Sequence, residues 1–246
     1  MKKNKNFIDA FGSEVMDAFK GEDEVFEIVE RDDGYIDAAH VKDRYFSEYK
    51  DWSEIEKKAV ALAHGRVLDI GCGAGRHSLY LQKKGFDITG IDVSPLAIKV
   101  CQLRGLKKAK VLSIDDVDTF KSDSFDSVIM FGNNFGFFQG PEKFRALLKK
   151  FEKILSDKGV IIAIATDPYK TDNPIHTAYH KLNLSRGRMG GQLKIRLRYK
   201  KLTTPYFDYL FASQKELKEL LKGTRWKIRK LIGSQKPSYV VILEKN

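Results

Sequence analysis

Short apolar runs alternate with helical patterns through the middle of the chain. Five such runs have the continuous apolar character of strands that are buried on both faces: residues 66–70, 86–91, 109–114, 124–130 and 160–166. Helices are expected over residues 75–84 and 141–156, and a third begins at Ser94-Pro95, where Ser is a typical N-cap and Pro a typical first helical residue. The alternation predicts an α/β fold with a mostly parallel sheet.

The two ends of the chain show other patterns. Apolar residues at helical spacing open the chain: Phe7, Phe11, Val15 and Phe19. Residues 40–64 predict a second helical stretch, so we expect a helical cap over residues 1–60. Near the other end, residues 213–216 form a capping box that opens a helix, and residues 226–232 and 239–243 predict two strands of a hairpin.

Three glycines at alternate positions follow the first apolar run. Gly71, Gly73 and Gly75 come directly after it, and Asp69 lies within it. Glycine lets a turn pass close to a ligand because no Cβ obstructs the approach. A strand, a glycine-rich turn and a helix N-terminus together make a site for a polar or anionic group. The dinucleotide fingerprint is G-x-G-x-x-G, so the G-x-G-x-G spacing found here departs from it.

Acidic residues follow the next two runs. Asp92 follows the second run, about twenty residues after the glycines, where an acid can accept hydrogen bonds from both ribose hydroxyls. Asp115-Asp116-Val117 ends the third run. Over roughly residues 66–132, this order of motifs resembles that of the class I S-adenosylmethionine-dependent methyltransferases. The resemblance extends over most of residues 60–246 and implies S-adenosylmethionine as cofactor and S-adenosylhomocysteine as product.

The family resemblance also implies roles for individual residues. Asp69 would fix the loop and the ammonium end of the cofactor, and Asp92 would hold the ribose. An acid and an apolar residue would hold adenine, and we choose Asp116 over Asp115 by its offset to residues 124–126. Arg76 would reach the cofactor carboxylate or only satisfy the start of its helix. The expected cofactor-binding set is Asp69, Gly71, Cys72, Gly73, Gly75, Arg76, Asp92, Val93, Asp116, Val117, Phe131, Gly132 and Asn133.

The fold implied by the resemblance is a three-layer, doubly wound, mostly parallel seven-stranded sheet with an antiparallel C-terminal hairpin. An N-terminal helical cap over residues 1–60 precedes a methyltransferase domain over residues 61–246. Residues 168–212 form an insertion after the fifth strand, where the superfamily commonly recognises the acceptor. We interpret residues 168–192 within it as a substrate lid, because they are longer than an ordinary connection.

The segment after the fourth strand bears on the acceptor. Gly132-Asn133-Asn134-Phe135 resembles the G-N-x-F type of motif found in some small-molecule methyltransferases and differs from the N-P-P-Y type of amino-group methylases of adenine or peptide glutamine. Phe135, Phe137 and Phe138 would line a pocket or pack against a helix, and Tyr45, Phe46, Tyr49 and Trp52 have the same two interpretations. The candidate acceptor-binding residues are Tyr45, Tyr49, Asn134, Phe135, Tyr169 and Arg186.

Candidates for proton transfer are weak. Asp167 ends the fifth strand, where an acid could accept a proton from the acceptor, but Asp-Pro also opens turns. His176 and His180 share a face if they lie on a helix. They lack the Glu of an H-E-x-x-H zinc motif, so we expect no metal. A methyl group on a sulfonium is already activated, so in-line positioning suffices and a general base is optional.

Charge is distributed unevenly. Of the net charge of +11, residues 1–56 contribute −8, from 16 acids and 8 bases, and residues 57–246 contribute +19. The acidic leader would lie on the basic body, and in a sharper version it would gate the site. Lys194, Arg196, Arg198 and Lys200 alternate with apolar residues as one face of a strand, which could hold an anionic acceptor or simply protect an exposed strand.

Composition agrees with one cytoplasmic enzyme. The two cysteines, Cys72 and Cys101, form no disulfide framework or zinc pattern, and neither a signal peptide nor an apolar run of membrane-spanning length is evident. The favoured function is methyl transfer to a small molecule. Alternatives are an RNA or protein methyltransferase that uses the basic segment 186–201, a cofactor-binding protein without activity, and a nicotinamide-dependent oxidoreductase.

Overall fold

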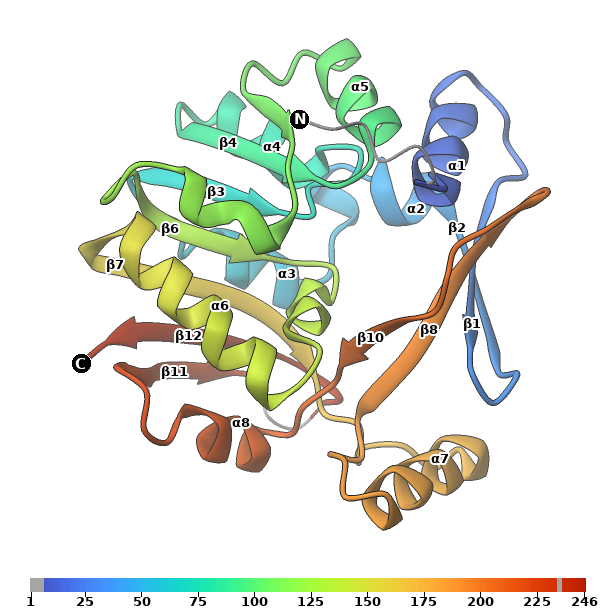
Figure 1. Ribbon diagram of the computed structural model, residues 1–246. Coiled ribbons are helices and arrows are strands. Elements are labelled where there is room, and N and C mark those ends of the chain that lie inside the picture. The colour runs from blue at the N-terminus through green and yellow to red at the C-terminus, as the bar shows by residue number, and fades with distance from the viewer. Residues whose placement is uncertain (1–6, 234–235) are drawn as a thin grey trace.

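The computed structural model describes residues 7–233 and 236–246 and contains two sheets (Figure 1). The larger has seven strands in the order β11-β12-β7-β6-β3-β4-β5. Its strands are β3 (Arg66–Ile70), β4 (Asp87–Asp92), β5 (Ala109–Val111), β6 (Phe125–Met130), β7 (Leu155–Thr166), β11 (Trp226–Ile232) and β12 (Ser238–Lys245). β3 to β7 pair in parallel, and β12 pairs antiparallel with both β7 and β11. The predicted sheet and its antiparallel hairpin are therefore confirmed.

Helices cover both faces of this sheet, which explains why its central strands are apolar throughout. The helices of this part of the chain are α3 (Glu54–Val60), α4 (Arg76–Lys83), α5 (Pro95–Leu103), α6 (Pro141–Ile154) and α8 (Gln214–Leu221). Two 3-10 segments, η2 (Ile114–Thr119) and η3 (Asn134–Phe138), follow β5 and β6. α5 and α8 begin at the predicted caps, Ser94 and the Ser213–Glu216 capping box. Within the described residues, no helix is both long and apolar enough to cross a membrane.

The second sheet has five strands and is built from two distant parts of the chain. Its order is β10-β8-β1-β2, and β9 pairs with β8. The strands are β1 (Phe26–Arg31), β2 (Ile36–His40), β8 (Gln192–Tyr199), β9 (Leu202–Thr203) and β10 (Phe207–Leu210). β1 lies antiparallel to β8, with Ile28 opposite Arg198. In Figure 1 this second sheet stands beyond the carboxyl ends of β3 and β6.

The prediction of a helical cap over residues 1–60 agrees with the structure only in part. α1 (Ala10–Phe19) confirms the first predicted helix, whereas residues 26–40 form a hairpin that we did not predict. The hairpin exists because β8, a strand from the insertion, pairs with β1 along its other edge. A strand stabilised by a distant partner leaves only a weak local signal.

The second helical stretch is also broken. Residues 40–64 contain α2 (Val41–Tyr45), η1 (Tyr49–Asp51) and α3 rather than one helix. Ser53 starts α3 with a capping box to Glu56, so the chain leaves one helix and begins another.

The insertion after β7 begins with α7 (Pro174–Ser185) and continues into β8, β9 and β10. The predicted lid, residues 168–192, therefore consists largely of a helix. α7 packs at the end of the second sheet through Tyr179, which lies in a small core with Leu193 and Ile195. The leader and the insertion thus form one structure on the same side of the seven-stranded sheet (Figure 1).

Candidate functional site

Residues 71–75, the glycine loop, connect β3 to α4 in a conformation that requires glycine. Gly71, Gly73 and Gly75 have φ angles of 67°, 56° and 80°. The N–H groups of Gly71 and Cys72 donate to the carbonyl of Ile91, at 2.9 and 3.0 Å, which anchors the loop to β4. The structure thus places the loop at the carboxyl edge of the parallel strands, where ligands of open α/β sheets bind.

Two buried acids flank this loop. The Asp92 carboxylate accepts hydrogen bonds from the Gly73 N–H at 3.0 Å and the Ser94 N–H at 2.9 Å. Burial raises the pKa of Asp92 to about 6. Asp69 accepts a hydrogen bond from the Ser78 hydroxyl at 2.6 Å, and burial raises the pKa of Asp69 to about 7. Asp69 therefore holds the loop to α4, and Asp92 ties it to the start of α5.

Two aromatic rings of the leader cover the glycine loop. A Cβ at Gly73 would meet the Tyr45 ring at 3.2 Å and the Phe11 ring at 3.4 Å, and these rings contact each other edge to face. Asp9 fixes α1 in this position, because its carboxylate accepts from the Ser94 hydroxyl at 2.9 Å and the Leu96 N–H at 3.1 Å. The leader therefore contacts both the glycine loop and the β4–α5 connection.

Residues 132–138, the amide loop, approach the glycine loop from the other side. The Asn134 amide donates to the carbonyls of Ile70 and Gly71, at 2.8 and 2.9 Å. Asn133 has a positive φ of 65°, and its carbonyl accepts a hydrogen bond at 2.6 Å from the hydroxyl of Tyr209 on β10. A Cβ at Gly71 would also meet the Phe137 ring at 2.7 Å. The second sheet is therefore joined directly to this loop.

The other predicted cofactor residues have different surroundings. Val93 is 51% exposed beside Asp92, and Gly132 is exposed with a φ of 61°. The Asp116 side chain is exposed, whereas Asp115 pairs with Lys143.

Three further members of the predicted set are more enclosed. Val117 and Phe131 are buried in the two cores of the large sheet. Cys72 is a free, buried cysteine with its sulfur 3.8 Å from that of Cys101.

Arg76 contacts residues of the leader in this structure. Its guanidinium donates to the Ser47 hydroxyl at 2.8 Å, pairs with Glu56 and lies over the Trp52 ring. Burial opposes the charge of Glu56, but the His77 ring, whose Nε2 lies 3.5 Å from the carboxylate, and the charge of Arg76 outweigh it and lower the pKa of Glu56 to about 2. Of the two roles considered for Arg76, the observed contacts support a structural one at the start of α4.

Among the candidate acceptor residues, Tyr45 and Asn134 reach the glycine loop, but Phe135 and Tyr49 do not. Phe135 is 1% exposed, and its ring packs with Phe138 and with Phe144 of helix α6 in the core. Tyr49 stacks on Tyr80 at 4.6 Å, on the outer side of α4. The contacts of these two rings fit the packing interpretation, because aromatic residues at helical spacing also fill cores.

The remaining candidates lie on the insertion side. The Tyr169 hydroxyl donates to Glu216 at 2.6 Å, and Arg186 is an exposed residue at the end of α7. His176 on α7 lies 3.1 Å from the Arg31 guanidinium, and His180 is buried one turn later. Asp167 accepts from the Tyr169 N–H at 3.1 Å. Among the described residues, no contact joins these side chains to the glycine loop, and no group of three metal-ligating side chains is present.

The basic face of β8 is largely neutralised by the leader. Arg196 and Arg198 both pair with Glu30 of β1, at 2.7 and 3.0 Å, and Lys200 pairs with Asp17 of α1 at 2.7 Å. Lys194 is exposed. The acidic leader therefore lies on the basic body, as its charge suggested.

Sequence reasoning missed Asp9, Tyr209 and the buried acids Glu14 and Glu27. Asp9 caps α1 and could have been recognised as an Asp three residues before Gly12. The Tyr209 hydroxyl bonds the carbonyl of Asn133, and Glu27 accepts from the Tyr45 hydroxyl, so both residues act through contacts that no local pattern marks.

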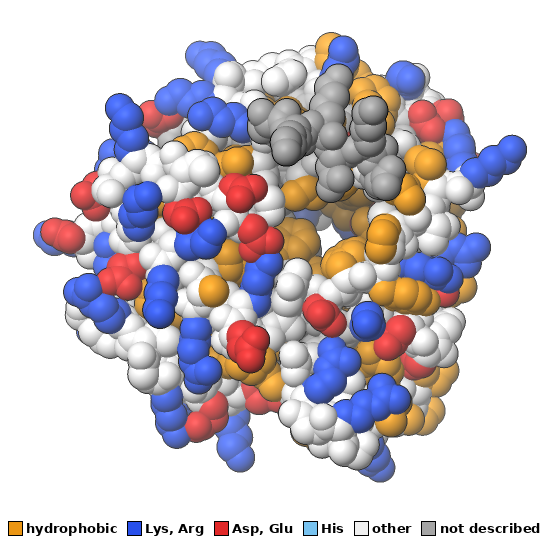
Figure 2. Space-filling model, in the orientation of Figure 1, with side chains coloured by type: hydrophobic (Ala, Val, Ile, Leu, Met, Phe, Trp, Pro, Cys, Tyr) orange, Lys and Arg blue, Asp and Glu red, His pale blue; other side chains and the backbone are white. Residues whose placement is uncertain are grey.

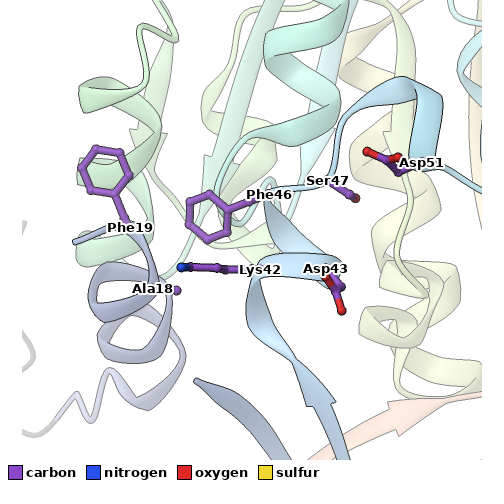
Figure 3. A pocket seen from close by; sticks show the side chains of 7 residues that line it. All are labelled: Ala18, Phe19, Lys42, Asp43, Phe46, Ser47 and Asp51. Atoms are coloured by element: carbon purple, nitrogen blue, oxygen red, sulfur yellow. The ribbon is translucent and has the colours of Figure 1, made fainter. Parts of the chain in front are cut away.

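A surface pocket of about 590 Å³ lies between α1 and α2 (Figure 3). Its lining comes from the leader alone and includes Phe19, Lys42 and Phe46. None of the predicted cofactor residues lines it, so we assign it no part in the site. Figure 2 shows a different hollow, with hydrophobic side chains on its walls, between the large sheet and the leader.

Comparisons with known proteins agree with this geometry. Residues 67–159 match a family model described as a methyltransferase domain. The chain is similar to the ubiquinone biosynthesis O-methyltransferase of Xanthomonas oryzae pv. oryzae, with 39% identity over 72 residues that cover 27% of this chain and 30% of that protein. The chain thus matches less than a third of the length of this curated relative.

Solved structures extend the likeness to nearly the whole chain. A methyltransferase from Bacteroides fragilis, crystallised with S-adenosylhomocysteine, superposes with a TM-score of 0.81 and 25% identity, over 96% of this chain and 94% of that one. The CcbJ methyltransferase from Streptomyces caelestis shares the fold, with a TM-score of 0.62 and 12% identity over 96% and 98% of the two chains.

Proposed function

We propose that this chain, which belongs to the class I S-adenosylmethionine-dependent methyltransferases, transfers a methyl group to a small-molecule acceptor. The observation that carries the proposal is that two tyrosines contact the glycine loop and the amide loop. Tyr45 of the leader covers Gly73, and Tyr209 of the insertion bonds the carbonyl of Asn133. Both tyrosines come from elements outside the cofactor-binding core, so the acceptor would bind where they meet the two loops.

The residues at the carboxyl edge fit the cofactor. The glycine loop offers backbone without Cβ atoms, and Asp92 has carboxylate lone pairs left after its two backbone contacts. S-adenosylmethionine supplies a methyl group on a positively charged sulfur. Asp92 would accept hydrogen bonds from the ribose hydroxyls, Asp69 would keep the loop in place, and Asp116 would contact adenine.

The chain's own contribution to the reaction is then positioning and exclusion of water. Orientation of this kind can supply roughly 7–11 kcal/mol of the barrier reduction. The Phe11, Tyr45 and Phe137 rings lie against the glycine loop and would keep water from the methyl group. Strands β8 and β10 and the leader would recognise the acceptor, and α7 would support them from the end of the sheet.

The alternative of an RNA or protein acceptor gains no support from the basic segment. Arg196, Arg198 and Lys200 are already paired with acids of the leader, so they do not form a free cationic surface. The name of the Xanthomonas relative, an O-methyltransferase of ubiquinone biosynthesis, agrees with a small-molecule acceptor.

The test is transfer of label from methyl-labelled S-adenosylmethionine into a fractionated cell extract, followed by nuclease or protease treatment. We expect label that survives both treatments and stays in the small-molecule fraction. Label lost to nuclease or protease would contradict a small-molecule acceptor. Calorimetry with S-adenosylhomocysteine and, separately, NAD tests the cofactor class independently of any acceptor.

A further inference from the structure

Glu14 is a buried acid without a partner. It lies in the middle of α1 and is 0% exposed. Among the residues that the structure describes, neither of its carboxyl oxygens has a hydrogen-bond partner. A buried carboxylate normally has an ion pair or hydrogen bonds, because leaving it alone costs several kcal/mol. Glu14 therefore has no partner that would offset the cost of its burial.

The charges around Glu14 are unbalanced. Glu27 on β1, Arg44 on α2 and Asp9 before α1 are the charged groups that act on it most strongly. Arg44 pairs with Glu27, and Asp9 is occupied with the Ser94 hydroxyl and the Leu96 N–H. Arg104 of α5 donates to the Ala74 carbonyl instead. The Arg44 guanidinium also lies 3.8 Å from Asp37, so it is engaged by Glu27 and Asp37 and bonds neither oxygen of Glu14.

Burial is the main cause that raises the pKa of Glu14 to about 10, and the charge of Glu27 adds to it. Glu14 is accordingly protonated at neutral pH while no ligand is bound. A cation placed beside it would favour the ionised form and lower this pKa again.

This acidic pair adjoins the proposed acceptor site. Glu27 accepts a hydrogen bond from the Tyr45 hydroxyl at 2.7 Å, and the ring of the same tyrosine covers Gly73. Glu14 follows Phe11 by three residues on α1, so both lie on one side of the helix. On the opposite side, the charge of Glu27 helps to raise the pKa of Tyr209, whose hydroxyl reaches the amide loop.

We propose that the methyl acceptor carries a protonated amine, which binds between Glu14 and Glu27, and that Glu14 takes the proton that the amine must lose. The proposal rests on the proposed methyl transfer to a small molecule and specifies its substrate class. A hydroxyl acceptor would bring no positive charge and would leave the pair unbalanced. An anionic acceptor would disfavour ionisation of Glu14 and would leave it without a proton-accepting role.

The chemistry balances. Binding of the ammonium group lowers the pKa of Glu14, whose proton passes to solvent. The Glu14 carboxylate then takes one proton from the ammonium group, which becomes a neutral amine. Its nitrogen lone pair forms the new N–C bond to the methyl carbon while the C–S bond breaks, and the electrons of that bond stay on sulfur. The products are a methylated ammonium and S-adenosylhomocysteine, and Glu14 keeps its proton when the product leaves, which restores the protonated acid of the free protein.

The experiment compares Glu14→Gln with Glu24→Gln, a change of an exposed leader acid that lies outside the site. Label from methyl-labelled S-adenosylmethionine is followed into a fractionated cell extract, and labelled small molecules are passed over a cation exchanger at pH 7. For the unchanged protein and E24Q, we expect a retained, positively charged product. For E14Q we expect about 100-fold slower formation, the usual consequence of losing one side of a buried charge pair.

S-adenosylhomocysteine affinity separates the possible failures. We expect E14Q to bind S-adenosylhomocysteine within twofold of the unchanged protein. Weaker binding would make Glu14 a cofactor residue and overturn the proposal, as would a labelled product that passes through the exchanger or an unchanged rate in E14Q. If the unchanged protein fails to bind S-adenosylhomocysteine or to label any fraction, the proposed function itself fails.

A thermal measurement supports the same test. Because the unfolded chain ionises Glu14 near pH 4.5 and the folded one holds its proton to about pH 10, the carboxyl lowers stability increasingly as pH rises between these values. E14Q removes this effect, so it should melt higher than the unchanged protein at pH 8 while it transfers methyl groups more slowly. A residue that only supports the fold would give a lower melting temperature instead.

Discussion

The two sheets differ in how the chain builds them and in what they offer a ligand. Strands β3 to β7 of the large sheet follow one another along the chain. β3 ends at the glycine loop, and β6 ends at the amide loop. The second sheet joins β1 to β8, with Glu30 opposite Arg196, and carries Glu27 and Tyr209 toward those loops. Cofactor binding and acceptor binding are thus assigned to separate parts of the chain, and substitutions should separate them.

The largest expected effect lies in the core of the large sheet. Phe135→Ala should lower the free energy of unfolding by about 3–5 kcal/mol, because the ring is buried against Phe138 and Phe144. Phe137→Ala should cost much less stability, since that ring is only partly buried and faces Tyr209 and Gly71. Urea unfolding measures both. Equal losses would show that the two rings share one environment.

Asp92→Ala tests the cofactor side of the comparison. Removal of a carboxylate that would accept two ribose hydroxyls should weaken S-adenosylhomocysteine binding by about 3 kcal/mol, or roughly 100-fold. Calorimetry gives the affinity, and circular dichroism shows whether the glycine loop survives the loss of the Gly73 contact. An affinity within a factor of three, in a folded variant, would exclude the ribose role of Asp92.

The sequence predicted the large sheet well because its signals are local. The glycines at residues 71–75, the cap at Ser94 and the apolar runs each act within a few residues, and the structure confirms the elements they predict. The hairpin of residues 26–40 was not predicted, because β1 is stabilised by β8, a strand far along the chain. Glu27 and Tyr209 were missed because their contacts, with the Tyr45 hydroxyl and the Asn133 carbonyl, form only when the chain has folded.

The pH dependence of cofactor affinity should follow Asp92. Its pKa is raised to about 6, so the charged form that accepts ribose hydroxyls is present above pH 6 and is lost as pH falls through that value. Neighbouring Asp69, with a pKa near 7, spreads the transition upward. The dissociation constant for S-adenosylhomocysteine should rise by at most tenfold per pH unit between pH 6 and 5. Asp92→Asn should flatten this change, and an equal slope in that variant would assign it to another group.

Tyr209→Phe tests the connection between the two sheets. The substitution removes one hydrogen bond to the Asn133 carbonyl and leaves the ring, which should cost about 1 kcal/mol, or roughly 2–4 °C in melting temperature. Because the second sheet would then hold the amide loop less firmly, we expect slower methyl transfer with unchanged S-adenosylhomocysteine affinity. Calorimetry and labelled transfer give the two values, and a loss confined to affinity would place Tyr209 on the cofactor side.

The smallest effect is expected on the outer face of the second sheet. Lys194→Ala should change the free energy of unfolding by less than about 0.5 kcal/mol, because its side chain is exposed. RNA retention at low salt should also be unchanged, since Arg196 and Arg198 of β8 and the following Lys200 are already paired with Glu30 and Asp17. A filter-binding titration with and without added salt measures this retention. Strong, salt-sensitive retention that falls in the variant would make β8 a nucleic-acid surface and would reverse the assignment of the second sheet to a small acceptor.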